Sequence, residues 1–359
     1  MDFLSLIPVP DTIPAPAGLF LVLDILTFTL HILVINIIVG SSILMLFTRM
    51  KGGDDVLLKR SYSPALNKIP TLFAIGINLG VAPLLFLQVI YGHLFYTSSV
   101  LMAVYWIMVI PFLILAYYSA YILSRKYAIS ELLSKASLWI MAVLLLYIGF
   151  MLVTNNMLMI QPEKWTAYFD NRGGTILNLS DPTLIPRYLH FIGASVAVAG
   201  LFMASLWHLR GKKSVEGVGE KVKFLKVFAW STIVQMLIGS WFLMVLPRPI
   251  MMKFMGNHLP ATILIVIGFL GAIGATITAL RGKLRPTISM TLIAILVMVI
   301  NRQILRGFYL KDIFHLDSLR LAPQYGVMAL FLLILVIGLS AVGYMLKISM
   351  KKNERSTAR

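Results

Sequence analysis

Long apolar stretches alternate with short polar segments along the whole chain. Nine of the stretches are long enough to cross a bilayer as helices, since about 20 apolar residues span its hydrocarbon core. They cover residues 19–48, 69–91, 94–123, 136–160, 184–209, 223–246, 259–280, 286–303 and 324–346. Because backbone groups in lipid must be satisfied internally, the pattern predicts an all-α polytopic membrane protein with no β-sheet in the membrane.

Basic residues gather on every second connecting segment. When the segments are taken alternately as outer and inner, the inner ones hold 22 of the 31 Lys and Arg residues and 6 acids, a net charge of +16. The outer ones hold 9 basic residues and 8 acids, a net charge of +1. Basic loops stay in the cytoplasm. The split therefore predicts a protein of a prokaryotic cytoplasmic membrane, with its N-terminus on the outer side and its C-terminus in the cytoplasm.

Composition leaves little room for a soluble domain. Hydrophobic residues make up 59% of the chain and charged residues 13%. We therefore expect one membrane domain over 1–359, with an outer lead-in (1–18), a nine-helix bundle (19–346) and a basic cytoplasmic tail (347–359). The formal charge of +17 lies mainly on inner segments, where it meets anionic membrane lipid, so nucleic-acid binding is not expected.

The chain has no cysteine. This excludes disulfides, c-type haem attachment and cysteine-ligated iron–sulfur or zinc sites. Any metal must therefore be held by His, Met or oxygen ligands.

Three histidines lie within the apolar stretches, and one of them, His208, is at the inner end of the fifth stretch. His31 lies about 12 residues into the first stretch, with no acid at membrane depth after it; it either bonds to a neighbouring helix or ligates a haem or another metal. His190 follows Arg187 by three residues, so both side chains share one helix face. A neutral imidazole suits a haem iron, and a nearby cation suits the haem propionates.

Two further histidines are expected at the outer surface. His93 follows Gly92 at the expected turn between the second and third stretches, and His258 precedes Pro260 at the entry of the seventh. Each is either interfacial or a ligand.

Small residues after His190 permit close approach of a flat macrocycle or tight helix packing, and the residues alone favour packing. They are Gly193, Ala194, Ser195, Ala197, Ala199 and Gly200.

Acids are scarce at membrane depth. Asp24, near the start of the first stretch, is the only candidate. Proton pumps and proton-fed oxidases rely on buried acids. We therefore expect this chain to have little or no activity as an oxidase that reduces oxygen with electrons from quinol.

Several short motifs resemble those of one known family. They are His31 in the first stretch, LFAIGINLGVAPLL (72–85), TNNMLMIQP (154–162), DPTLIPRYLHFIGAS (181–195) and NRQILR (301–306). In this order the chain resembles, in divergent form, subunit I of the cytochrome bd-type oxidase superfamily. The number of spans and the outside N-terminus agree with that family.

The resemblance implies one or two haem b groups near the outer face. In the family, a basic residue three positions before a His precedes the low-spin haem b ligand, which matches Arg187 and His190. The family's span-one His, which ligates a high-spin haem, matches His31. NRQILR is similar to the family's Gly-Arg-Gln signature, which implies that Arg302 and Gln303 lie beside the cofactor.

The chain also departs from the family. The family's methionine ligand on span seven is missing near Leu264, so the second ligand is open, with His93, His258 or a Met of 250–255 as candidates. The family's carboxylate three residues before the signature arginine is Val299, the paired glutamates of span three are missing, and the quinol-binding loop is short. The resemblance thus implies a bd-like subunit that is not itself a quinol oxidase.

Three functions are compatible with these observations. The first is a haem b subunit of a respiratory complex that exchanges electrons with an extracytoplasmic partner, such as a c-type cytochrome, and pairs with a second membrane subunit. The second is a haem-free structural anchor of such a complex. The third is a transporter, which would show inverted repeats and broken spans. A reduced-minus-oxidised visible spectrum separates the first two.

Overall fold

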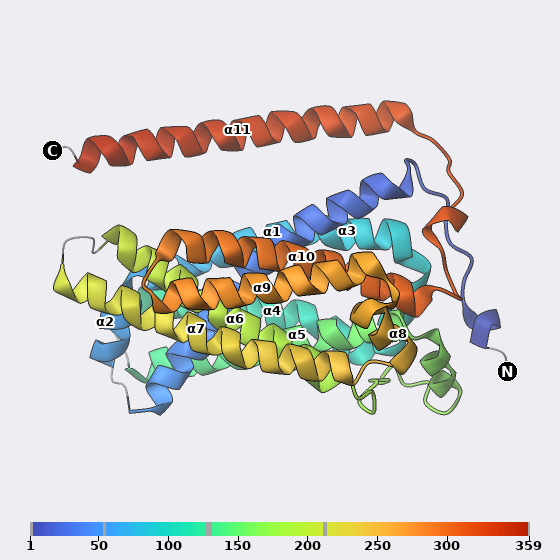
Figure 1. The fold of residues 1–359 in the computed structure, drawn as a ribbon, viewed down its shortest axis with the longest axis horizontal. Helices are drawn as coiled ribbons and strands as arrows, with labels where there is room; N and C mark the ends of the chain where they lie inside the picture. The colour runs from blue at the N-terminus through green and yellow to red at the C-terminus, as the bar shows by residue number, and fades with distance from the viewer. Residues whose placement is uncertain (1–2, 53–54, 127–130, 211–213, 358–359) are drawn as a thin grey trace.

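The computed structural model describes residues 3–52, 55–126, 131–210 and 214–357 (Figure 1). Within these ranges the chain is 85% helical and has no strand, and nine helices are long and apolar enough to cross a membrane. The predicted class, an all-α polytopic membrane protein, is therefore confirmed.

The nine apolar helices follow the predicted order. They are α1 (Ala17–Met50), α3 (Ile69–Leu101), α4 (Ala103–Lys126), α5 (Glu131–Met159), α6 (Leu184–Arg210), α7 (Val215–Met244), α9 (Leu259–Leu280), α10 (Leu284–Leu310) and α11 (Tyr325–Thr357). Shorter helical segments are η1 (Phe3–Leu6), α2 (Asp55–Leu66), η2 (Pro162–Phe169), α8 (Arg248–Met252), η3 (Lys253–Asn257) and η4 (Leu316–Ser318). Because α2 and α8 lie at opposite ends of the bundle (Figure 1), we call these ends the α2 end and the α8 end. The charge pattern predicts that the α2 end faces the cytoplasm.

The first inner segment forms the amphipathic helix α2, which hydropathy did not predict because the helix is too short to span. The helix packs on α1 and α6 through one face. Apart from Pro64, the buried residues have the spacing of a single helical stripe. They are Leu58, Ser61, Tyr62, Ala65 and Leu66.

Helix α3 continues ten residues beyond the predicted end of the second span, to Leu101. The backbone kinks at Tyr91, where φ is −119° and ψ is 22°, and then resumes its helical course. Leu94 and Phe95 after the kink are buried, so packing outweighs the turn signal of Gly92. The prediction that His93 lies in an outer turn is therefore wrong, because His93 lies within α3.

Helix α1 lies at the centre of the bundle and contacts α3, α5, α6 and α10. It approaches α6 most closely at Gly40, where a Cβ atom would lie 1.9 Å from the carbonyl oxygen of Ser195. Gly200 is pressed against the backbone of Phe228 on α7 in a similar way. The small residues of α6 thus serve helix packing, as the residues alone favoured.

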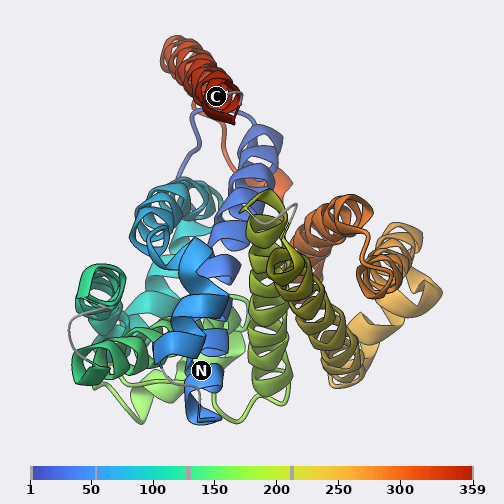
Figure 2. The same ribbon diagram turned by 90° about the vertical axis from the view of Figure 1, so that its left-hand side faces the viewer.

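Helix α11 lies apart from the other apolar helices in both views (Figures 1 and 2). No residue in its most apolar window is buried. The segment before it is tied to the N-terminal lead-in, since Ile13 donates to the Arg320 carbonyl (2.9 Å) and accepts from the Ala322 amide (2.9 Å). The expected basic tail is helical as far as Thr357.

Candidate functional site

A group of buried polar side chains lies at the α8 end of the bundle, where four apolar helices meet. Helix α10 contributes two arginines and a glutamine, and α1, α3 and α5 contribute one residue each. We call this group the Asp24 cluster. It consists of Asp24 (α1), Tyr91 (α3), Asn156 (α5), and Arg302, Gln303 and Arg306 (α10).

Gln303 links the acid of the cluster to one of its bases. Its Nε2 donates to Oδ2 of Asp24, and its Oε1 accepts from Nη1 of Arg306 at 2.7 Å. The same Nη1 lies 3.9 Å from the Asp24 carboxylate. Since a carboxylate only accepts and a guanidinium only donates, the two neighbours fix the orientation of the Gln303 amide. All three side chains are buried.

The two arginines of α10 also share a neighbour on α5. Oδ1 of Asn156 accepts from Nη2 of Arg302 (3.4 Å) and from Nη2 of Arg306 (3.3 Å). Each guanidinium lies over an aromatic ring of another helix: Arg302 over Phe28 at 4.2 Å and Arg306 over Tyr91 at 4.8 Å. Ring faces stabilise a cation that has little access to water.

The site carries more positive than negative charge. Asp24 is the one carboxylate that bonds within the cluster, and it faces the guanidinium groups of both Arg302 and Arg306. Arg187 of α6 lies within electrostatic range of the same two arginines and packs 4.9 Å from the ring of Phe242. Its Nε and Nη2 are buried without a hydrogen-bond partner in the described part of the chain. Such a region attracts an anionic group.

His190 lies one helical turn after Arg187, against α7. Its Nε2 lies 3.4 Å from Nε2 of Gln235, while its Nδ1 is buried and has no hydrogen-bond partner among the described residues. The imidazole rests against Gly239, where a Cβ atom would lie 3.2 Å from the ring. With the amide nitrogen of Gln235 facing it, Nε2 of His190 accepts and Nδ1 carries the proton. If the Gln235 amide were turned the other way round, its oxygen would accept from Nε2, and Nδ1 would then keep the lone pair that a metal needs.

His31 packs against Gly80 of α3 and bonds to Gly76, one turn earlier on the same helix. Its Nδ1 is 3.0 Å from the carbonyl oxygen of Gly76. A Cβ atom at Gly80 would lie 2.6 Å from the ring, so a larger residue there would have to displace the imidazole. Because a carbonyl only accepts, Nδ1 carries the proton and Nε2 keeps its lone pair. Metal-binding histidines commonly have this second hydrogen bond to a carbonyl.

The structure does not bring the other two candidate histidines against His190. His93 on α3 packs 4.9 Å from the ring of Phe314. His258 caps the N-terminus of α9, where its Nδ1 accepts from the amide of Ala261 at 3.3 Å. The residues in contact with His190 are Gln235 and Gly239. A role of His93 or His258 as second ligand therefore stays a prediction.

The chemistry of these residues fits the needs of a haem b. In the described ranges, no three His, Cys, Asp or Glu side chains form a group that could hold a bare metal ion. A haem iron needs only one or two axial ligands from the protein. The lone pair on Nε2 of His31 suits that role, and the unpaired arginine donors suit two propionates. Nδ1 of His190 would suit it with the Gln235 amide turned so that its oxygen faces Nε2.

The sequence did not reveal the residues that hold these groups in place. Gln235, Gly239, Gly76 and Gly80 have no distinctive spacing of their own. Asp24 was visible as the one acid at depth, and a buried acid in lipid needs a cation. That rule could have paired it with the arginines near the outer end of the eighth stretch.

Comparisons of this chain with families of known proteins, with curated proteins and with solved structures found no significant match.

Proposed function

We propose that this chain is a cytochrome bd-like membrane subunit that carries haem b near the outer face. In this proposal it passes electrons to or from an extracytoplasmic redox partner in a respiratory complex. The resemblance of its motifs to cytochrome bd subunit I suggests the cofactor, and the chemistry of the site supports it.

One observation carries the proposal. Arg187 and His190 share one face of α6, and both have buried nitrogen atoms without hydrogen-bond partners in the described part of the chain. Leaving such an atom unpaired costs about 1–3 kcal/mol, more for a charged group. Neighbouring unsatisfied imidazole and guanidinium groups therefore favour a ligand that offers both a metal and carboxylates.

A bound haem b would supply one-electron oxidation and reduction of its iron. His190 would hold one group, and His31 would hold a second. Arg187, Arg302 and Arg306 would hold propionate charge at a depth where water cannot screen it. Gln303 and Asn156 keep the arginines of α10 fixed through the hydrogen bonds described above.

We also propose two kinds of partner. The excess positive charge near the α8 end suits an acidic extracytoplasmic protein, such as a c-type cytochrome. The separate position of α11, whose most apolar window buries no residue, suits contact with a second membrane subunit.

A haem-free structural anchor is the second candidate. It is favoured by the close packing of the His31 ring against Gly80 and by the hydrogen bond from Nδ1 to the Gly76 carbonyl. In that case both histidines would be structural residues of the helix interfaces.

A visible spectrum of the purified protein tests the proposal. We expect a reduced-minus-oxidised spectrum typical of haem b, and His190→Ala should remove one haem per chain, because its imidazole would be an axial ligand. His315→Ala is the matched control, since His315 is exposed and is not a member of the Asp24 cluster. Haem content would be measured as pyridine haemochrome.

A wild-type protein without haem, purified intact from its native membrane, would instead identify the anchor. Haem that stays at wild-type stoichiometry in folded His190→Ala protein would show that His190 is not a ligand.

A further inference from the structure

An open groove runs along the surface of the bundle at the α2 end, between the end of α1 and the first half of α7. Its volume is about 870 Å³. Leu44, Val222 and Val227 contribute apolar walls. Phe47 and Trp230 border it and are 54% and 64% exposed. Large aromatic side chains exposed at the end of a span are typical of the membrane–water interface.

Three lysines line the groove: Lys51, Lys223 and Lys226. None of the described residues that line it is acidic. Nζ of Lys51 lies 4.5 Å from the ring centroid of Phe47, so the cation sits directly above an apolar wall. The groove therefore combines a cationic rim with an apolar floor.

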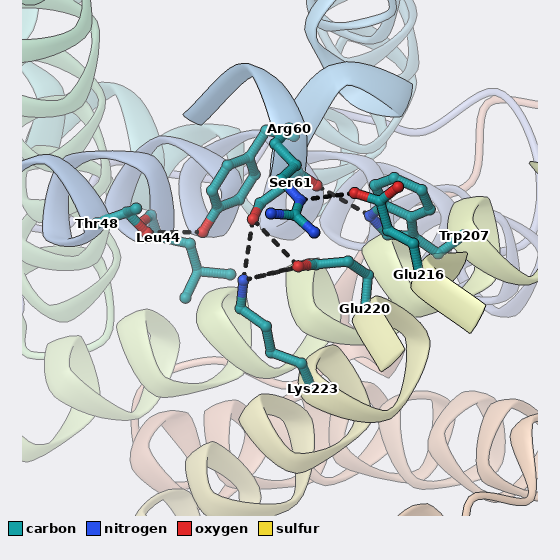
Figure 3. A network of polar contacts seen from close by, with 9 residues as sticks. Leu44, Thr48, Arg60, Ser61, Trp207, Glu216, Glu220 and Lys223 are labelled. Carbon is teal, nitrogen blue, oxygen red and sulfur yellow. Dashed lines mark hydrogen bonds and ion pairs between the residues drawn. The ribbon is translucent and has the colours of Figure 1, made fainter. Parts of the chain in front are cut away.

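Two acids of α7 lie beside α2, where they bond to Arg60, Ser61 and Lys223 (Figure 3). Oε1 of Glu216 accepts from Nε of Arg60 at 2.6 Å. Glu220 accepts from Lys223 at 3.1 Å and from Ser61 at 3.4 Å. Among the described residues, these contacts leave Lys51 and Lys226 as the lysines of the groove whose charge is not compensated by an ion pair.

The same network joins α2 to α6 and α7 (Figure 3). Nζ of Lys223 donates to Oγ of Ser61 at 2.9 Å, and the indole of Trp207 donates to the Ser61 carbonyl at 2.9 Å. Tyr62, next to Ser61, bonds to Thr48 of α1 at 3.1 Å, and burial raises the pKa of Tyr62 to about 12. Its hydroxyl thus remains neutral, and these hydrogen bonds join α1, α2, α6 and α7 in one frame beside Lys223.

The α7 side of the groove runs from Gly219 to Ser231 as one helical stripe. Lys226 precedes Trp230 by four residues, which rise roughly 6 Å along a helix. A headgroup beside Lys51 and Lys226 would therefore place the part of an acyl chain nearest to it against Trp230.

The alternatives fit less well. A small water-soluble anion would make no favourable contact with the apolar floor or with the exposed Phe47 and Trp230. Another transmembrane helix would have to bury Lys226 against apolar side chains, which is costly. Basic pockets between helices at the cytoplasmic side commonly take anionic headgroups.

We propose that this groove is a binding site for an anionic phospholipid, with the phosphate at Lys51 and Lys226 and an acyl chain that starts between α1 and α7. The site lies at the end of the bundle opposite the Asp24 cluster and does not depend on the presence of haem. It would tie the frame around α2 to the lipid composition of the membrane.

Native mass spectrometry of the delipidated full chain, titrated with phosphatidylglycerol, tests this proposal. We expect one tightly bound lipid, and Lys51→Gln with Lys226→Gln should raise its Kd about tenfold or more, because each lysine near a headgroup contributes roughly 1 kcal/mol. Gly219→Leu is a second test variant, which alters the groove without changing its charge. Gly219 has open space around its Cα, so a side chain there should fill the groove and weaken binding too.

The matched control is Lys221→Gln with Lys347→Gln, which removes the same charge outside the groove. It should leave the tight site unchanged. Phosphatidylcholine with the same acyl chains should bind at least tenfold more weakly, and inorganic phosphate should not displace the lipid. Equal loss in the control, equal binding of phosphatidylcholine or displacement by phosphate would each overturn the proposal, as would retained tight binding in the Gly219→Leu protein.

Discussion

Gln303 illustrates how a single neutral residue can organise buried charge. Its amide accepts from Arg306 and donates to Asp24, so it connects two charges whose direct separation is 3.9 Å. Without a carboxylate, the guanidinium of Arg306 would be buried with only Gln303, Asn156 and the ring of Tyr91 around it. Removing one partner of a buried ion pair leaves the other uncompensated.

Asp24→Ala should therefore destabilise the protein strongly. We expect a loss of about 3–5 kcal/mol, because Arg302 and Arg306 keep their charge in a buried place. The measurement is the thermal melting temperature in detergent. Asp170→Ala provides the control, since Asp170 is exposed and its loss should change stability by less than about 0.5 kcal/mol. An Asp24→Ala protein as stable as the control would show that the ion pair does not hold the cluster together.

At the scale of helices, the bundle depends on places where two backbones nearly touch. Helix α1 crosses α6 where Gly40 meets the Ser195 carbonyl. One turn earlier on α1, Asn36 accepts from Oγ of Ser195 at 3.0 Å. Close approach of small residues, with a hydrogen bond beside it, is a usual source of helix association in membranes.

Gly40→Ala should separate α1 from α6. The added methyl group would lie 1.9 Å from the Ser195 oxygen, so the helices must move apart, with a loss of about 1–3 kcal/mol. Gly18→Ala is the matched control on the same helix, because no atom lies within 4 Å of its Cβ position. Melting temperatures of the two variants give the comparison. If both melted alike, the close contact at Gly40 would not limit helix packing.

At the scale of the whole molecule, eight apolar helices pack together and α11 lies apart within the described part of the chain. The Asp24 cluster lies at one end of the bundle, and the lysine-lined groove lies at the other. We expect the excess of basic residues at the α2 end to set the orientation of the chain in the membrane.

Reporter fusions test this orientation. Alkaline phosphatase, which is active only outside the cytoplasm, should be inactive when fused after Arg359. The same enzyme inserted after Arg172, in the exposed segment that follows η2, should be active. The expectation follows from the net charges of +16 and +1 on the two sides. Activity at the C-terminus together with inactivity at Arg172 would reverse the orientation.

The sequence by itself determined the class of protein and the order of its spans. Hydropathy is a local property, and each spanning helix satisfies its own backbone, so neither depends on which helices are neighbours. Helix ends were less predictable. Gly92 predicted a turn, but the burial of Leu94 and Phe95 keeps the chain helical there. Helix α2 was too short for hydropathy to detect.

Only the tertiary structure decided which polar groups meet. Asp24 and Gln303 are 279 residues apart in the chain, and nothing in their local sequence pairs them. The same holds for His190 with Gln235 and for His31 with Gly76. A polar side chain in lipid must find a partner, but the adjacency of helices selects that partner, and adjacency is set by packing at small residues such as Gly40.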